Sequence, residues 1–288
     1  MRVGVAAAPR WWGVEPAGLD PYLDHLAASG ATAVELIVHD GPASRDPSTV
    51  HLPRSLWSTT VARATSRGLH VDVHNSLDPR LSLERFAVDA SGFAADIAST
   101  LDLLADIEQH QGTPPSLVVH ADTSSPDPEA ATASAMTWIA NELVTRGSAG
   151  PTCLELRSAA SAEDRRFDRR REALVDFVDR LADDRLAVCW DVANDWLTAR
   201  RSSLPYALPE AVPARLGHVH LHDALPDGLL HAPLADGGVP WGPALELLRD
   251  ARWGGSATLE IRYRLASDVG EPWAVLAESI RRALSVER

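Results

Sequence analysis

Short apolar runs recur along the chain, and each is followed by a longer stretch with apolar residues three and four positions apart. The short runs are typical of strands, and the longer spacing is typical of amphipathic helices. The predicted strands are residues 2–8, 32–39, 69–75, 116–122, 152–158, 186–192, 216–223 and 257–263. Successive strands begin roughly 30 to 47 residues apart, which is the length of a strand–helix–strand unit.

This alternation favours a parallel sheet covered by helices, and eight such units favour closure into a (β/α)8 TIM barrel. No glycine-rich dinucleotide-binding motif follows the first strand, which disfavours an open doubly wound sheet. Residues 192–215 carry Ser/Leu/Pro segments and only a weak helical pattern, so one helix is expected to be short or missing. Because no linker divides the chain, we predict an α/β fold with residues 1–288 as a single domain.

The composition of the chain bears on where in the cell the protein is expected. The chain has 288 residues, 45% of them hydrophobic, and no apolar run approaches the roughly 20 residues that a membrane span requires. The N-terminal segment lacks the small-residue cleavage site of a signal peptide, and the two cysteines, Cys153 and Cys189, are too few for a disulfide framework. We therefore expect a soluble cytoplasmic protein with two buried thiols and no membrane partner.

Charge narrows the partners and the chemistry. The net charge of −13 disfavours a nucleic-acid partner, because duplex binding depends on Lys and Arg side chains that neutralise phosphates. All 27 basic residues are arginine, so any mechanism that needs a lysine Schiff base is excluded. A small-molecule substrate is the remaining expectation.

Polar side chains alternate with apolar ones near the carboxyl ends of the predicted strands, where barrel enzymes carry their chemistry. Four consecutive strands supply Glu155, Asp191, His220 and Glu260. Burying isolated charges costs several kcal/mol unless they are paired or bind a metal. Any one of these residues alone would be read as a hydrogen-bonding or capping residue, but four in register predict one divalent metal ion. Three carboxylates and an imidazole suit Mn²⁺ foremost, and also Mg²⁺, Co²⁺ or Zn²⁺.

The segment "GHVHLHDA" (217–224) places three histidines on one face of a strand. We expect His220 to be the metal ligand and His218, one layer deeper, to be a hydrogen-bonded core residue. His222 is expected to line the substrate pocket or to reach solvent. Asp223 is expected to support a ligand or to cap the end of the strand. The two cysteines face the same way but lie deeper, so they are not expected to be ligands.

Several segments resemble the xylose isomerase-like barrels, a family of sugar and sugar-phosphate isomerases and epimerases that also includes endonuclease IV-type DNA repair enzymes. These segments are "GATAVEL" (30–36), "VHN" (73–75), "VVHAD" (118–122), "LEL" (154–156), "CWDVAN" (189–194), "HVHLHD" (218–223), "HAPLADGGVPW" (231–241) and "LEI" (259–261). The resemblance covers essentially the whole chain, and the segment with three histidines is the most specific. It implies one divalent metal ion held by Glu155, Asp191, His220 and Glu260.

Two departures from the family pattern matter. The family motif Asp-x-x-His is here Asp191 followed by Asn194, so an amide replaces an imidazole that touches substrate or a second metal. The Asp-x-His pair of the trinuclear zinc endonucleases is absent, because Leu229 stands two residues before His231. Together with the negative charge, these departures disfavour the DNA repair function and favour a mononuclear site.

The resemblance implies an isomerase or epimerase of a sugar or related hydroxyketone. Its metal would grip two adjacent substrate oxygens and stabilise an enediolate, while Glu155 and Glu260 exchange the proton from opposite faces. His74 and His120 would hydrogen-bond substrate hydroxyls or only fill the barrel. Further substrate contacts are predicted for Arg157, Asn194, His222, His231, Arg262 and Trp12. Arg157 and Arg262 would hold a carboxylate, phosphate or keto oxygen, or else form structural ion pairs.

Two alternatives to this function stay open at this point. A lyase, such as a dehydratase or a deglycosylating enzyme, would use the same proton removal to expel a β-leaving group. A non-catalytic barrel is the alternative from a different class.

Trp11, Trp12 and Trp241 are expected on loops at the mouth of the barrel, where they would stack on substrate, form a lid or contact a second subunit. The sequence itself does not fix the oligomeric state, and the resemblance implies a homodimer, because barrels of this family often pair.

Overall fold

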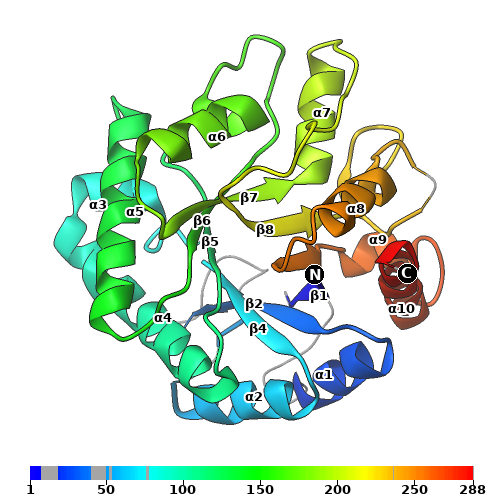
Figure 1. The fold of residues 1–288 in the computed structure, drawn as a ribbon, viewed down its shortest axis with the longest axis horizontal. Helices are drawn as coiled ribbons and strands as arrows, with labels where there is room; N and C mark the ends of the chain where they lie inside the picture. Colours follow the sequence, from blue (N-terminus) through cyan, green and yellow to red (C-terminus); the bar gives the residue numbers. More distant parts are fainter. Residues whose placement is uncertain (8–18, 40–49, 52–53, 76–77, 236, 288) are drawn as a thin grey trace.

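Eight parallel strands close into a barrel with helices around the outside, in a computed structural model that describes residues 1–7, 19–39, 50–51, 54–75, 78–235 and 237–287 (Figure 1). The barrel strands are β1 (Arg2–Ala7), β2 (Ala33–His39), β4 (His70–His74), β5 (Leu117–Val119), β6 (Thr152–Glu155), β7 (Leu186–Asp191), β8 (Leu216–Leu221) and β11 (Ser256–Leu259). Strand β1 pairs with both β2 and β11, which closes the barrel. The predicted TIM barrel is confirmed.

Three short strands were not predicted. Strand β3 (Val50–His51) pairs with the end of β2. Strands β9 (Asp223–Ala224) and β10 (Leu230–Ala232) form an antiparallel pair after β8. This β9–β10 hairpin folds over residues that the sequence pattern places at the rim of the barrel, and it changes their exposure, as described below.

The helices follow the strands around the barrel (Figure 1). They are α1 (Leu19–Ala28), α2 (Arg54–Ser66), α3 (Leu83–Val88), α4 (Ala90–Gln111), α5 (Pro128–Thr145), α6 (Arg171–Arg180), α7 (Val192–Arg201), α8 (Trp241–Asp250), α9 (Tyr263–Ser267) and α10 (Pro272–Glu287), with a 3₁₀ turn at Phe167–Arg169 before α6. Helices α3 and α4 share one amphipathic pattern but separate at Asp89, whose side chain accepts the Gly92 N–H and so caps α4. None of the described helices combines the length and the apolar character needed to cross a bilayer.

The helix expected to be short or missing is present. Helix α7 has ten residues and begins directly after β7, because the Asp191 side chain accepts the backbone N–H of Asn194 and caps it. The first turn is buried, with Val192 and Ala193 in the apolar core and the polar residues Asn194 and Asp195 beside them, which weakens the amphipathic pattern.

The two faces of the barrel strands differ in what they pack against. The outward faces join the helices in one large apolar core, which includes Val71, Leu154 and Val219. Inside the barrel only a small apolar cluster is found among the described residues: Val118, Cys153, Ala187 and Cys189. Neither cysteine forms a disulfide, and both are buried, as expected. Beside this cluster the interior also holds buried polar side chains, among them Glu35, Asp72, His218 and His220.

Candidate metal centre

The carboxyl ends of four neighbouring strands bring four ligand-type side chains together. They are Glu155 at the end of β6, Asp191 at the end of β7, His220 on β8 and Glu260 just after β11. One oxygen or nitrogen atom from each lies within 4.8 Å of the others, and all four residues are buried. The parallel register explains this convergence, because Asp191 pairs with His220 across β7 and β8.

His220 turns one ring nitrogen toward this cluster and the other toward a fifth residue. Its Nε2 lies 3.2 Å from both carboxylate oxygens of Glu35, a residue of β2 that is fully buried. We assign the proton to Nε2, which donates to Glu35 and leaves the lone pair of Nδ1 toward the cluster. Nδ1 is buried without a hydrogen-bond partner. It lies 3.5 Å from Glu260 Oε2 and 3.8 Å from Glu155 Oε1.

This donor set fits a divalent cation. Three carboxylates confined in a buried space repel one another unless a positive charge lies between them. Burial alone would lower the pKa of His220, yet the neighbouring Cys189, Glu260 and Glu35 raise it well above its ordinary value. The surroundings therefore favour a positive charge at this place, and a metal ion ligated by Nδ1 and the carboxylates would supply it.

Asp191 is oriented by two neighbours. Its Oδ1 accepts the backbone N–H of Asn194 at 2.8 Å, and its Oδ2 accepts the side-chain amide of Asn194 at 2.6 Å. His222 Nε2 lies 3.2 Å from the same Oδ2. Because the backbone N–H of His231 donates to His222 Nδ1 at 3.1 Å, the His222 proton belongs on Nε2 and donates to Asp191. Asn194 and His222 thus fix the direction of the Asp191 carboxylate.

The two glutamates of the cluster have opposite electrostatic surroundings. Glu155 Oε2 lies 3.0 Å from His74 Nε2 and 2.7 Å from His120 Nε2. Burial would raise the pKa of Glu155, but His120, His220 and His74 outweigh burial and hold it well below its usual value. Burial raises the pKa of Glu260, and Glu155 adds to this shift while His220 opposes it. In this environment Glu155 is the stronger acid of the pair.

A second polar layer lies deeper in the barrel and is centred on His218. The Ser116 hydroxyl donates to Asp72 Oδ1 at 2.8 Å and lies 2.9 Å from His218 Nδ1. On the other side of the ring, His218 Nε2 lies 3.0 Å from Glu35 Oε2 and 2.9 Å from the Thr258 hydroxyl. Both nitrogens of His218 therefore have protein partners. The prediction that His218 is a hydrogen-bonded core histidine is confirmed.

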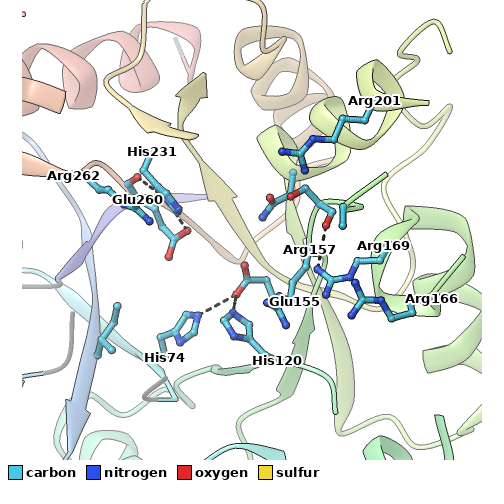
Figure 2. Close-up of a pocket in the computed structure, with 14 residues that line it drawn as sticks. His74, His120, Glu155, Arg157, Arg166, Arg169, Arg201, His231, Glu260 and Arg262 are labelled. Carbon is cyan, nitrogen blue, oxygen red and sulfur yellow. Dashed lines mark hydrogen bonds and ion pairs between the residues drawn. The ribbon is translucent and has the colours of Figure 1, made fainter. Parts of the chain in front are cut away.

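A pocket of about 420 Å³ opens above the cluster (Figure 2). Of the predicted site residues, it is lined by His74, His120, Glu155, Arg157, Asn194, His231, Glu260 and Arg262. His231 adopts a positive φ of 65°, and its Nδ1 lies 3.2 Å from the Glu260 carbonyl oxygen. The strands and loops from β4, β5, β6, α7, β10 and β11 thus contribute to one cavity.

Other predictions are corrected or lie outside the described residues. His222 is fully buried and is not among the pocket-lining residues, because the β9–β10 hairpin covers it. Trp241 begins α8 and donates from Nε1 to the Ala235 carbonyl at 3.0 Å, so it holds a loop and does not line this pocket. Asp223 accepts the N–H groups of Ala235 and Gly237, which favours the capping role. Trp11 and Trp12 lie outside the described residues.

Sequence reasoning missed Glu35 and three arginines of the pocket. Glu35 was detectable as a single charge within the apolar strand "TAVELIVH" (32–39). The arginines, which are Arg166, Arg169 and Arg201, line the pocket beside the predicted Arg157 and Arg262. The signal for Arg166 and Arg169 was the arginine-rich run at residues 165–171, and Arg201 stands only in the pair at residues 200–201.

Comparisons with known proteins agree with this architecture. A D-psicose 3-epimerase from Clostridium cellulolyticum H10, solved with D-tagatose, has 17% identity and a TM-score of 0.67, over 100% of this chain and 98% of that one. A D-allulose 3-epimerase from Methylomonas sp., solved with D-allulose, has 14% identity and a TM-score of 0.65, over 100% of this chain and 97% of that one. A xylose isomerase domain protein from Alicyclobacillus acidocaldarius has 18% identity and a TM-score of 0.66, over 100% of this chain and 98% of that one. At such identities the likeness shows the fold.

The fold and the polar strand ends define a TIM barrel with a buried carboxylate–histidine site at its mouth. The sequence profile described as "Xylose isomerase-like TIM barrel" matches residues 23–284. The chain therefore belongs to the xylose isomerase-like TIM barrel family, as the sequence segments suggested. No curated protein sequence matches the chain significantly.

Proposed function

We propose that this protein is a divalent-metal-dependent isomerase or epimerase of a sugar-like hydroxyketone. The observation that carries the proposal is the buried, unpartnered Nδ1 of His220, which faces carboxylates of Glu155 and Glu260 at the floor of an open pocket. The sugar 3-epimerases that share the fold support the choice of substrate. We further propose Mn²⁺ as the metal and residues 1–288 as one cytoplasmic domain that pairs into a homodimer.

Four residues would hold the cation: Glu155, Asp191, His220 and Glu260. A divalent ion bound there would act as a Lewis acid on adjacent substrate oxygens and favour loss of a proton from carbon. Glu35 keeps His220 in the tautomer whose Nδ1 is available. Asn194 and His222 keep the Asp191 carboxylate in one orientation, and His74 and His120 do the same for Glu155.

The two glutamates would move the proton. Glu155, whose pKa is held low by its histidines, is ionised and accepts a proton from the substrate carbon, which leaves an enediolate. Glu260, which faces the same pocket, would return a proton from the other side. Because a carboxylate near a cation is a weak base, close positioning in the pocket must supply much of the rate.

A lyase on the same scaffold is the second candidate, and Asn194 favours it. The family motif has an imidazole at this position that touches substrate. Here the Asn194 amide donates to Asp191 at 2.6 Å. It therefore orients a proposed metal ligand, and the pocket lacks an imidazole at this position. A substrate with a β-leaving group would use the same proton removal.

Deuterium exchange separates these functions. The purified protein is loaded with Mn²⁺ and incubated with ketoses in deuterated water. Deuterium at carbon with an unchanged carbon skeleton and retained oxygen supports isomerisation or epimerisation, whereas loss of water or of an aglycone supports a lyase. Absence of metal binding, with no exchange in any candidate ketose, would refute both functions.

A further inference from the structure

Five arginines surround the pocket above the candidate metal centre (Figure 2): Arg157, Arg166, Arg169, Arg201 and Arg262. The chain has 40 acidic and 27 basic residues, so a concentration of cations at one pocket runs against its overall charge. The acidic residues that line the same pocket are Glu155 and Glu260, both proposed as metal ligands. The rim is therefore a local region of positive charge on an anionic protein.

Two of these arginines are compensated by their own neighbours. Arg166 binds Asp164 through two hydrogen bonds of 3.0 and 2.7 Å. Arg169 is 6% exposed, lies 3.3 Å from Asp168 and donates to the Ser158 carbonyl. These contacts hold the segment between β6 and α6 against the pocket.

Arg157 and Arg201 differ from these two. Within the described ranges no carboxylate forms an ion pair with either guanidinium, and Arg201 donates to the backbone carbonyl of Ala159 at 2.7 Å. Arg157 is half-buried beside Arg169. Burial lowers the pKa of Arg169, Asp168 opposes this shift, and the charges of Arg157 and Arg166 add to it. Crowded guanidinium groups of this kind are stabilised when an anion binds between them.

A neutral ketose does not require such an arrangement, because its hydroxyls bind equally well to amides, hydroxyls and imidazoles. A guanidinium matches the paired oxygens of a carboxylate or phosphate and forms short, charge-assisted hydrogen bonds with them. The pocket of about 420 Å³ contains both the glutamates and the arginines, so one small molecule would reach both.

We infer that the substrate carries an oxyanion, a phosphate or a carboxylate, which binds to Arg157 and Arg201 while its hydroxyketone end lies at Glu155 and Glu260. This inference rests on the proposed function for the hydroxyketone end. The anion-binding end stands on the arginines alone.

Calorimetric titration of the Mn²⁺-loaded protein tests the inference with three matched probes: D-fructose, D-fructose 6-phosphate and D-fructuronate. At least one anionic probe is expected to bind about 10-fold or more tighter than D-fructose. The tighter of the two anionic probes identifies phosphate or carboxylate as the bound group.

The variants Arg157→Gln and Arg201→Gln are each expected to lower the ratio of the affinity for the anionic probe to the affinity for D-fructose by about 10-fold. The matched control is Arg200→Gln, because Arg200 is the preceding exposed residue of α7 and donates to the Pro226 carbonyl, outside the pocket. Arg201 is exposed, so its variant is expected to fold even if Arg157→Gln does not.

Equal affinity for all three probes, or an Arg201→Gln ratio equal to that of Arg200→Gln, would overturn the inference. Because the titration measures heat and not turnover, it is independent of the deuterium assay. If a neutral ketose exchanges deuterium and the anionic probes bind no more tightly than D-fructose, only the inference about the anion is refuted. If the anionic probes bind more tightly but no ketose exchanges deuterium, only the proposed function is refuted.

Discussion

His218 and His220 stand two residues apart on β8, and both are fully buried, yet their surroundings are opposite. His218 has protein partners on both ring nitrogens. His220 has Glu35 on Nε2, and its Nδ1 has no hydrogen-bond partner in the described chain. Both are histidines, both are fully buried and both lie on the same face of β8, so none of these properties distinguishes a structural histidine from a candidate ligand. The two differ in the surroundings of Nδ1, which has a partner in His218 and none in His220. The layer around His218 can therefore be used as a control for the layer around His220.

The largest expected effect is in the upper layer, at its two glutamates. Glu155→Gln and Glu260→Gln should each reduce turnover by about 1000-fold or more, because each removes both a proton carrier and a charge from the cluster. Deuterium exchange of the substrate, together with metal content by mass spectrometry, measures both losses. Glu246→Gln, on the exposed side of α8, is the control. Near-normal exchange by either variant would show that the acid/base assignment is wrong.

Replacing the two histidines breaks the comparison directly. His220→Asn should abolish the metal-induced increase in melting temperature, which for the native protein corresponds to about 2.7 kcal/mol at a metal concentration 100 times the Kd.

His218→Leu should instead lower the free energy of unfolding by about 3 kcal/mol, since it removes one buried partner of the Glu35 carboxylate and the ring nitrogen beside the Ser116 hydroxyl. The His218→Leu variant should retain the metal-induced increase in melting temperature. Thermal and urea unfolding with and without Mn²⁺ measure both quantities. If the two variants behave alike, the distinction between the layers fails.

Glu35 belongs to both layers, because it contacts His218 and His220. Glu35→Gln should weaken metal binding by about 10- to 100-fold, since the amide holds the His220 ring less strongly and adds no negative charge. Metal titration followed by calorimetry gives the affinity. Asp72→Asn is the control, because Asp72 belongs only to the deeper layer, and its metal affinity should match that of the native protein.

The smallest effect is expected at Asn194. Asn194→Ala removes the side-chain hydrogen bond to Asp191 but keeps the backbone N–H that caps α7. A single such bond contributes about 1 kcal/mol, so metal affinity should fall by less than about 10-fold. A larger loss in the same titration would mean that Asn194 contacts the metal or its substrate.

The fold and the upper layer were predictable from sequence for a physical reason. Strand and helix periods differ, and parallel strand ends meet at one edge, so the register of Glu155, Asp191 and His220 can be read from the chain. Glu35 gave no comparable pattern, because its inward neighbours on β2, Ala33 and Ile37, are apolar.

The remaining errors came from tertiary structure. The burial of His222 depends on a hairpin whose strands are two and three residues long, too short for any periodic signal. Arg166, Arg169 and Arg201 reach the pocket from a 3₁₀ segment and a helix end, and no local pattern fixes where such side chains meet. Trp241 follows a Gly- and Pro-rich segment that is typical of a loop, but it is the first residue of helix α8.

The junction between β7 and α7 has no connecting loop, since Asp191 ends the strand and caps the helix. An insertion there would separate the carboxylate from the N–H that it caps, and would cost the protein a helix start and a candidate ligand together. The segment between β6 and α6, by contrast, lines the pocket with Arg157, Arg166 and Arg169, so a change in its length would alter the pocket and leave the β7–α7 junction itself unchanged.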